Sequence, residues 1–152
     1  MAERNLFLKI GNPLMRWLTR SPLHGLISNS VMLVTVTGRK SGKKYSTPVN
    51  YQQQGNRLVT ISQRQRTWWR NLRGGAPVSL RLRGREIPAQ GAVIEDPKLV
   101  RQEVDVILLR SPGMARYLGI SLEVNGSPDP RDLSRAARQR VIVVFTLDEG
   151  DV

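Results

Sequence analysis

The spacing of short β-prone runs constrains the fold of this chain more than any other feature of its sequence. Val31 to Thr37 reads VMLVTVT, a turn occupies positions 38–44, and a second run extends from Tyr45 to Tyr51. A connection this short favours an antiparallel hairpin, because parallel strands need a crossover of roughly a dozen residues or more. Further runs follow at similar spacing, which argues against a doubly wound parallel sheet.

The remaining segments predict more strands and two helices. Asp96-Pro97 is typical of a helix start, since proline is well tolerated at the first helical position, and the helix is expected to end near Leu109. Arg140 to Leu147 is a continuous apolar run, which predicts a strand buried on both faces. Pro48 favours an edge position for the second strand. The other expected elements are strands at Arg57–Ile61, Pro77–Arg83 and Glu86–Ile94, a short helix within 114–122, and polar loops over 123–139.

This order of elements predicts a mainly β protein with flanking helices (α+β), built on a closed or half-closed antiparallel barrel. With 152 residues, the chain is expected to form a single domain spanning 1–152. Within it, residues 1–28 are expected to form an N-terminal helical segment and residues 31–147 the barrel core.

Apolar residues recur at roughly helical spacing over positions 5–20, with basic residues among them. We expect this stretch to pack across the end of the barrel; the alternative is an amphipathic segment resting on a membrane surface, aided by Trp17. No run approaches the roughly 20 apolar residues that span a bilayer, and Lys9 and Asn12 interrupt the leader-like run. The expected location is therefore cytoplasmic, with membrane association as the alternative.

The net charge of +12 is concentrated in one part of the chain. Residues 1–85 contain 16 Lys and Arg and the single acid Glu3, whereas residues 86–152 contain 8 Lys and Arg and 11 acids. A field this one-sided attracts anions. Nucleic acid, an anionic membrane surface and a polyanionic small molecule therefore all remain candidate partners.

The residue types exclude several kinds of chemistry. The chain has no cysteine, which excludes disulfides, thiolate catalysis and cysteine-bound metal sites. His24 is the only histidine and no acid–base pair stands out, so neither a Ser-His-Asp triad nor a metal site is expected. If the protein is an enzyme, a bound cofactor should carry the chemistry.

Two motifs offer a binding site for a flat, multiply negative ligand. Thr35 to Pro48 reads TVTGRKSGKKYSTP, a basic turn framed by two glycines, whose successive N–H groups can form an anion-binding concavity. It is neither a Walker loop nor a G-x-G-x-x-G element. The second motif, Thr67 to Leu72, reads TWWRNL and supplies aromatic faces beside a cation. The alternatives are a solvated hairpin tip and core tryptophans of a short helix.

The order T-x-T-G-R-K-S-G, then T-P, then a strand, then W-W-R-N-L resembles the deazaflavin-dependent nitroreductase family over about Leu33 to Ile94. Members of that family are split β-barrel proteins of the flavin-binding (FMN-binding-like) superfamily that use coenzyme F420, and several are quinone reductases. The resemblance implies a split-barrel core over 31–147. It also implies transfer of hydride from reduced F420 to a quinone, enone or nitroaromatic acceptor.

The resemblance further implies which residues form the site. In such proteins the basic turn lies along the phosphate and acidic tail of the coenzyme, and the segment around the T-P pair lines the deazaflavin. The loop after the third strand contacts the ring system, and the W-x-x-N-L helix start closes the phosphate side. The corresponding cofactor-binding residues are Arg39, Lys40, Ser41, Tyr45, Ser46, Thr47, Pro48, Val49, Asn50, Ser62, Gln63, Arg64, Gln65, Trp68, Trp69, Arg70 and Asn71. Tyr117, which matches a tyrosine that often faces the acceptor, and Ser46 are the catalytic candidates.

Alternatives remain at this stage. The segment Ser62–Arg66 is bulkier and more charged than the small-residue loop common in the family, which leaves FMN as an alternative cofactor. Related split barrels also bind haem, and a basic nucleic-acid-binding barrel without enzymatic activity would use the same charge. The low aromatic content of 5% argues against nucleic acid, because few side chains can stack on bases. Monomer and homodimer are both open.

Overall fold

The computed structural model describes residues 31–152, so the expected helical segment 1–28, with its membrane-surface alternative, lies outside the described residues. Most of the strands follow one another before the three α-helices, as the hairpin spacing predicts. The strands are β1 (Val31–Thr37), β2 (Lys44–Asn50), β3 (Gln52–Gln54), β4 (Arg57–Gln63), β5 (Ala76–Leu82), β6 (Arg85–Ile94) and β7 (Arg140–Thr146). The helices are the 3₁₀ turn η1 (Trp68–Leu72), α3 (Pro97–Arg110), α4 (Met114–Leu118), α5 (Pro130–Gln139) and the 3₁₀ turn η2 (Glu149–Asp151).

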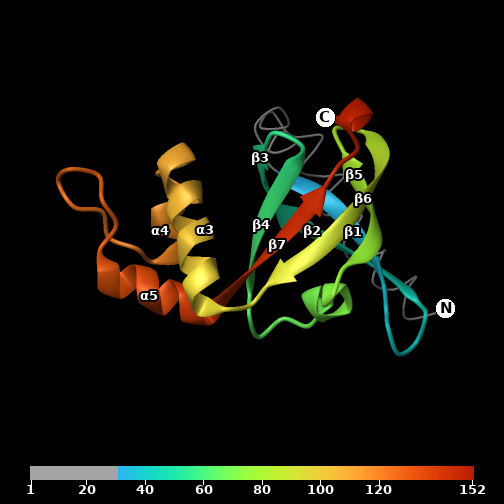
Figure 1. The fold of residues 1–152 in the computed structure, drawn as a ribbon, viewed down its shortest axis with the longest axis horizontal. Helices are drawn as coiled ribbons and strands as arrows, with labels where there is room; N and C mark the ends of the chain where they lie inside the picture. Colours follow the sequence, from blue (N-terminus) through green and yellow to red (C-terminus); the bar gives the residue numbers. More distant parts are fainter. Residues whose placement is uncertain (1–30) are drawn as a thin grey trace.

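The seven strands form one curled sheet in the order β2-β1-β5-β6-β7-β4-β3, and every pairing in it is antiparallel. The two edges of the sheet curl toward each other, so that the edge strand β2 contacts β4 without pairing with it. This is a split β-barrel, which confirms the predicted fold class (Figure 1). Pro48 lies in β2, which is an edge strand as expected.

β7 is the wall between two hydrophobic cores. Side chains alternate across a strand, so Val143 and Phe145 pack into the barrel while Ile142 and Val144 face the helices. The whole of β7 between Val141 and Phe145 is buried, as the continuous apolar run predicts. β4 repeats this division, with Leu58 in the barrel core and Val59 in the helical one.

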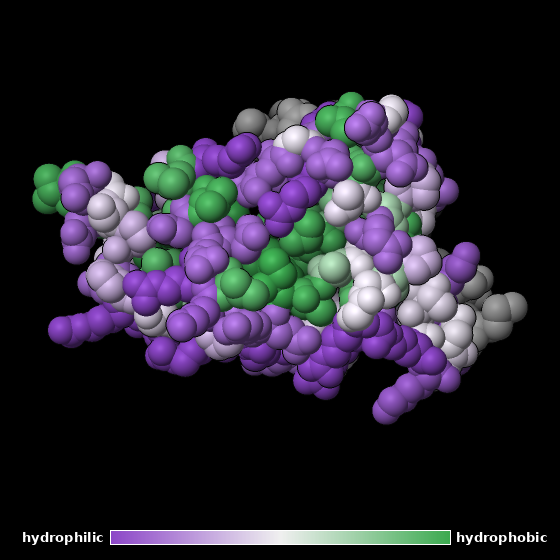
Figure 2. All heavy atoms as spheres, in the orientation of Figure 1, coloured by the Kyte–Doolittle hydropathy of each residue, from purple (hydrophilic) through white to green (hydrophobic). Residues whose placement is uncertain are grey.

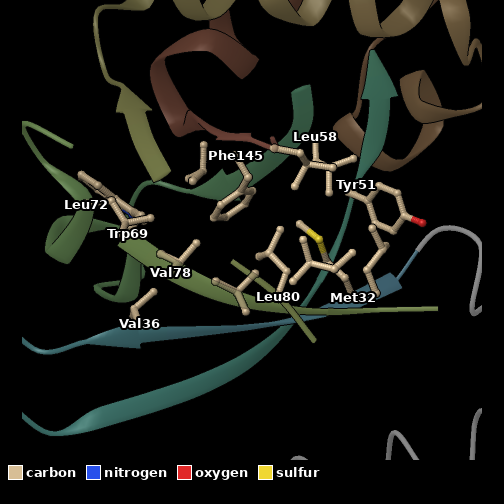
Figure 3. Packing of buried hydrophobic residues seen from close by; sticks show 14 of the residues in the cluster. Met32, Val36, Tyr51, Leu58, Trp69, Leu72, Val78, Leu80 and Phe145 are labelled. Atoms are coloured by element: carbon tan, nitrogen blue, oxygen red, sulfur yellow. The ribbon is translucent and has the colours of Figure 1, made fainter. Parts of the chain in front are cut away.

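The barrel core is filled by large side chains from strands far apart in sequence. Phe145 is fully buried and lies between Trp69 on one side and Leu58 on the other, with Met32 and Tyr51 at the far end (Figure 3). The core thus joins η1 to the strands, so the packing that stabilises the barrel also fixes the helix that carries the W-W-R-N-L motif.

Helices α3, α4 and α5 pack on the outer side of β4 and β7 (Figure 1). α3 begins as predicted: the Asp96 carboxylate accepts a hydrogen bond from the Lys98 N–H, and Pro97 follows at the first helical position. α3 ends one residue after the expected Leu109. Within the described residues, none of the helices is both long enough and apolar enough to cross a bilayer.

One expectation for the C-terminal half was wrong. Part of the expected loop over 123–139 is α5, which Asp129 caps by accepting from the N–H groups of Arg131 and Asp132. The helix was missed because its buried face is small, with only Leu133 and two alanines. The short helix expected within 114–122 is α4, which ends at Leu118 because Gly119 takes a left-handed conformation with φ of 70°.

Polar residues cover most of the face drawn in Figure 2, where apolar residues form a patch at the centre and smaller groups over the helical side. Val93 and Ile94 of β6 are half-buried apolar residues that contribute to the two cores from the strand next to β7. Scattered exposed apolar side chains such as Leu109 are normal for a folded domain.

Replacing Phe145 by Ala is expected to lower the free energy of unfolding by about 3–5 kcal/mol, since it removes a fully buried ring from the centre of the barrel. Leu109→Ala is the matched control, because Leu109 is 81% exposed and its truncation should change stability by less than about 0.5 kcal/mol. Urea unfolding followed by tryptophan fluorescence measures both. Equal effects of the two substitutions would contradict the assigned core.

Candidate functional site

The turn between β1 and β2 has a shape that requires glycine at two positions. A Cβ on Gly38 would lie 2.8 Å from the Ser41 Oγ and 2.8 Å from the Tyr45 ring, which is closer than real side chains approach. Gly42 has a φ of 70°, a left-handed conformation that favours glycine. The two glycines of the motif therefore hold the shape of the turn.

Half of the six N–H groups at positions 38–43 are committed to the turn itself. The Gly38 N–H donates to the Lys43 carbonyl, the Gly42 N–H to the Gly38 carbonyl and the Lys43 N–H to the Ser41 hydroxyl, at 2.7, 2.8 and 3.2 Å. With the Arg39 N–H donating to Asn71, these bonds reduce the expected concavity to the N–H groups of Lys40 and Ser41. The attraction that the turn offers to an anion comes mainly from its Lys and Arg side chains.

Asn71 joins the two sequence motifs directly. Its side-chain oxygen accepts from the Arg39 N–H, and its carbonyl accepts from Arg39 Nε, both at 3.1 Å. Its amide nitrogen donates to the Trp68 carbonyl within η1. Motifs 32 residues apart in sequence thus form one surface, and Asn71 and part of the Arg39 guanidinium are used to hold it together.

Trp68 and Trp69 point in different directions, as neighbours on a helix are expected to do. Trp68 is half-buried, and its indole N–H donates to the Ser62 hydroxyl at 3.2 Å, so β4 fixes the orientation of its ring. Trp69 is 1% exposed and belongs to the barrel core. The guanidinium groups of Arg70 and Arg73 lie 5.6 and 5.2 Å from the centroid of the Trp69 ring, so Trp69 positions two cations through its face.

Arg73 has a second partner in Glu95, at the end of β6. Its guanidinium donates two hydrogen bonds of 3.0 and 2.8 Å to the two carboxylate oxygens, a bidentate geometry. These hydrogen bonds hold the pKa of the Glu95 carboxyl below its usual range, with smaller contributions from the charges of Arg64 and Arg70. The same pairing raises the pKa of Arg73.

A basic cleft with a volume of about 920 Å³ lies between the turn and η1. Five of its lining residues are Lys or Arg, and no acid lines it within the described part of the chain. The cleft is larger than a single ion requires, and the aromatic rings of Trp68 and Tyr45 form part of its wall. The basic cleft is lined by Val36, Gly38, Arg39, Lys40, Ser41, Tyr45, Thr47, Gln65, Arg66, Thr67, Trp68, Arg70, Asn71 and Arg73.

An apolar cavity of about 490 Å³ lies between the edge strand β2, strand β4 and the ends of α3 and α4. It shares Trp68 and Arg66 with the basic cleft, so the two adjoin at the Trp68 ring. A volume in this range is typical of small-molecule sites. The apolar cavity is lined by Val31, Pro48, Val49, Asn50, Tyr51, Gln52, Val59, Ile61, Ser62, Gln63, Arg66, Trp68, Ile107, Ser111, Met114 and Tyr117.

A polar hollow of about 520 Å³ lies where β4 ends and β7 begins. It shares Gln63 with the apolar cavity, and Gln65 and Arg70 with the basic cleft. The polar hollow is lined by Gln63, Arg64, Gln65, Arg70, Gln139 and Arg140.

The structure brings most of the residues predicted from sequence together around the basic cleft and the apolar cavity, but not three of them. Ser46 is buried, bonds the Thr35 hydroxyl at 2.7 Å and lines none of the cavities. Trp69 lies in the core. Arg64 lines only the polar hollow, and its guanidinium donates to the carbonyls of Glu95, Arg138 and Arg140 at 2.6, 3.1 and 3.0 Å.

Sequence reasoning also missed residues that line the site. Arg73 forms part of the basic cleft, and its spacing of three from Arg70 on a short helix was the available signal. Ile107, Ser111 and Met114 line the apolar cavity from the junction of α3 and α4. Their contribution depends on how the helices pack on β4, which no local pattern reveals.

The edge position of β2 leaves backbone donors beside the site. Proline is accommodated in a strand where the N–H groups face away from the partner strand, and Pro48 lies opposite Leu33 in β1. N–H groups alternate in direction along an antiparallel strand, and Ser46 and Asn50 each lie two residues from Pro48. Their N–H groups are therefore expected to point away from β1, toward the opening between β2 and β4.

Comparison with known proteins identifies the family. The family model of F420H(2)-dependent quinone reductase matches residues 20–117, which is more than half of the chain. The chain belongs to this family, a class of oxidoreductases, as the sequence resemblance implies. No curated protein matches the chain.

Solved structures with the same fold are distant in sequence. One, described as a domain-swapped dimer, has a TM-score of 0.51 and 16% identity, with 88% of this chain and 94% of that chain covered. A putative pyridoxamine 5'-phosphate oxidase from Listeria innocua has a TM-score of 0.50 and 13% identity, with 89% and 94% covered. The FAD and heme binding protein from Mycobacterium smegmatis has a TM-score of 0.50 and 16% identity, with 86% and 67% covered. At these identities they support the split-barrel fold alone.

The Arg73–Glu95 pair predicts a specific pH dependence. A carboxyl whose pKa is lowered by folding stabilises the protein above its unfolded pKa, and this contribution is lost as the pH falls through the folded pKa. Arg73→Gln should return the Glu95 pKa toward its usual range in a carboxyl NMR titration, and should make the loss of stability below about pH 5 shallower. Arg81→Gln, which removes an equal charge from an exposed position on β5, should leave the Glu95 titration unchanged.

Proposed function

We propose that this protein is a reductase that binds reduced coenzyme F420 and delivers hydride to a small planar acceptor, of which a quinone is the first to test. The observation that carries the proposal is that a strongly basic cleft and an apolar cavity adjoin at Trp68. A ligand with a flat ring system at one end and a chain of negative charges at the other would occupy both at once.

The residues fit such a coenzyme on chemical grounds. Coenzyme F420 carries a phosphodiester and an oligoglutamate tail, and Arg39, Lys40 and Arg70 of the basic cleft offer charge-assisted hydrogen bonds to such groups. The ring system would lie toward the apolar cavity, past Trp68, whose orientation is fixed by Ser62. When bound in reduced form, the coenzyme supplies a hydride from C5 of the deazaflavin.

The protein would supply orientation, exclusion of water and hydrogen-bond donors to the charge that develops on the acceptor. The expected N–H groups of the β2 edge, near Ser46 and Asn50, are donors held by the sheet and need no reorganisation during reaction. Tyr117 lines the apolar cavity from α4 and offers a hydroxyl on the helical side. Thr47 lines the basic cleft from β2, whereas the Ser46 hydroxyl is bonded to Thr35 and lines no cavity.

The structure favours this proposal over the alternatives that the sequence left open. FMN ends in a single phosphate, which is too little charge for the four cations of the basic cleft other than Arg73, whose partner is Glu95. Nucleic acid needs a run of exposed stacking surfaces, whereas Trp69 is buried and Trp68 is half-buried. His24 lies outside the described residues, so the haem alternative gains no support from them. A homodimer is proposed by analogy with the domain-swapped neighbour.

Lys40→Ala is expected to weaken binding of oxidised F420 by roughly tenfold, because it removes a charged donor from the rim of the basic cleft. Lys40 is a cleaner probe than Arg39, whose guanidinium also holds Asn71. Fluorescence titration at two salt concentrations measures the effect, which should shrink at high salt. Arg81→Gln is the control, and equal affinities for Lys40→Ala and the wild type would contradict the assigned cleft.

The reaction itself is tested by following oxidation of F420H2 in the presence of a water-soluble quinone. Tyr117→Phe is expected to lower kcat by roughly tenfold or more, since it removes a hydroxyl donor to the acceptor, while the affinity for F420 should stay within twofold (about 0.4 kcal/mol) of the wild type. Wild-type protein that binds F420 but oxidises it with no quinone, enone or nitroaromatic would overturn the reductase assignment. A change in F420 affinity equal to the change in kcat would move Tyr117 to the coenzyme side.

A further inference from the structure

We propose that the polar hollow at the junction of β4 and β7 is a separate oxyanion subsite, which binds a carboxylate or phosphate group with Arg140 as its main donor. The inference concerns the junction of β4 and β7, which shares Arg70 of η1 with the basic cleft, and it rests on the proposed function only for the source of the bound anion. Three of the six residues that line the hollow are arginines, namely Arg64, Arg70 and Arg140, and the other three are glutamines.

Arg140 carries an unmet hydrogen-bonding need. Its Nη1 atom is buried from solvent and has no hydrogen-bond partner among residues 31–152. A buried charged donor without an acceptor costs free energy, because it has lost its hydration and gained no hydrogen bond in return. A guanidinium group is well suited to a carboxylate or phosphate, which can accept two of its N–H groups at once.

The other cations are held in place around Arg140. The guanidinium of Arg64 donates to three carbonyls, including that of Arg140 itself, so it fixes the strand end and keeps a positive charge there. Arg70 is held against the Trp69 ring. Fixed positive groups bind an anion with little loss of side-chain freedom.

Within the described residues, no carboxylate lines the hollow to neutralise these charges. Glu95, whose carbonyl accepts from Arg64, has its carboxylate committed to Arg73 by two hydrogen bonds. The hydrogen bonds from Arg73 are the main cause of the lowered pKa of Glu95, and the positive charges of Arg64 and Arg70 contribute less. The local field therefore attracts an external anion.

The position of the hollow connects it to both parts of the proposed active site. Gln63 lines the hollow and the apolar cavity, and the Arg140 guanidinium lies 5.4 Å from the centroid of the Tyr117 ring, another wall of that cavity. Gln65 and Arg70 line both the hollow and the basic cleft. The bound oxyanion is therefore either an acidic substituent of the acceptor or a carboxylate of the coenzyme tail.

The direct test uses inorganic phosphate and the protein alone. Gln139 lines the hollow and neither of the other cavities, so its side-chain amide NMR signal reports on this site. Phosphate should shift this signal saturably in the wild type, in Lys40→Ala and in the charge-matched control Arg81→Gln. Arg140→Gln should weaken the apparent Kd at least tenfold (about 1.4 kcal/mol), and Arg140→Lys, which keeps the charge but not the planar fork, should give an intermediate value. No saturable shift in the wild type, or an equal shift in Arg140→Gln, would overturn the subsite whether or not the protein binds F420.

Two further comparisons identify the source of the anion in the working enzyme. If the acceptor supplies it, Arg140→Gln lowers the ratio of kcat/KM for a carboxylated quinone to that for its neutral analogue. If the coenzyme tail supplies it, Arg140→Gln lowers the preference for long-tailed over short-tailed F420 in binding. Either result supports the proposal, and an unchanged value of both ratios in a folded Arg140→Gln protein would overturn its functional role. A thermal melt of Arg140→Lys and Arg140→Gln separates loss of the site from loss of the fold.

Discussion

The arrangement of this protein depends on β7 being buried on both faces. One face of β7 completes the barrel core and the other forms the floor of the helical layer, so neither layer is complete without it. β4 pairs with β7 along its whole length and is fixed by that pairing. β2 lies near β4 but does not pair with it, so the barrel is open between these two strands. The apolar cavity lies at this opening.

The site is assembled from segments that lie far apart in sequence and contact one another in the fold. Asn71 joins η1 to the basic turn, Ser62 of β4 orients Trp68, and the buried Trp69 ring carries Arg70 and Arg73 on its face. Several residues of the motifs thus serve to position the others. The signal that makes a family recognisable includes these positioning residues as well as those available to a ligand.

The sequence predicted the barrel, the edge strand and the two-sided burial of Arg140–Leu147, because strands can be recognised from local periodicity and from the turn residues between them. It also predicted that the basic turn and Trp68 lie at one site, and both line the basic cleft. It failed for α5, whose buried face is formed largely by alanines, and for Ile107 and Met114, which reach the apolar cavity only through helix packing. It assigned Ser46 as a catalytic residue, although the alternation of β2 turns its hydroxyl to Thr35.

The central claim is that the basic cleft and the apolar cavity together hold an anionic deazaflavin. The most direct measurement compares the dissociation constants of coenzyme F420 and FMN at low and high salt, by titration of their fluorescence. The account predicts that F420 binds much more tightly than FMN, and that added salt weakens F420 more than FMN because more charges are screened. Equal affinities that respond equally to salt would contradict it, since the five cations of the cleft would then have no part in choosing the ligand.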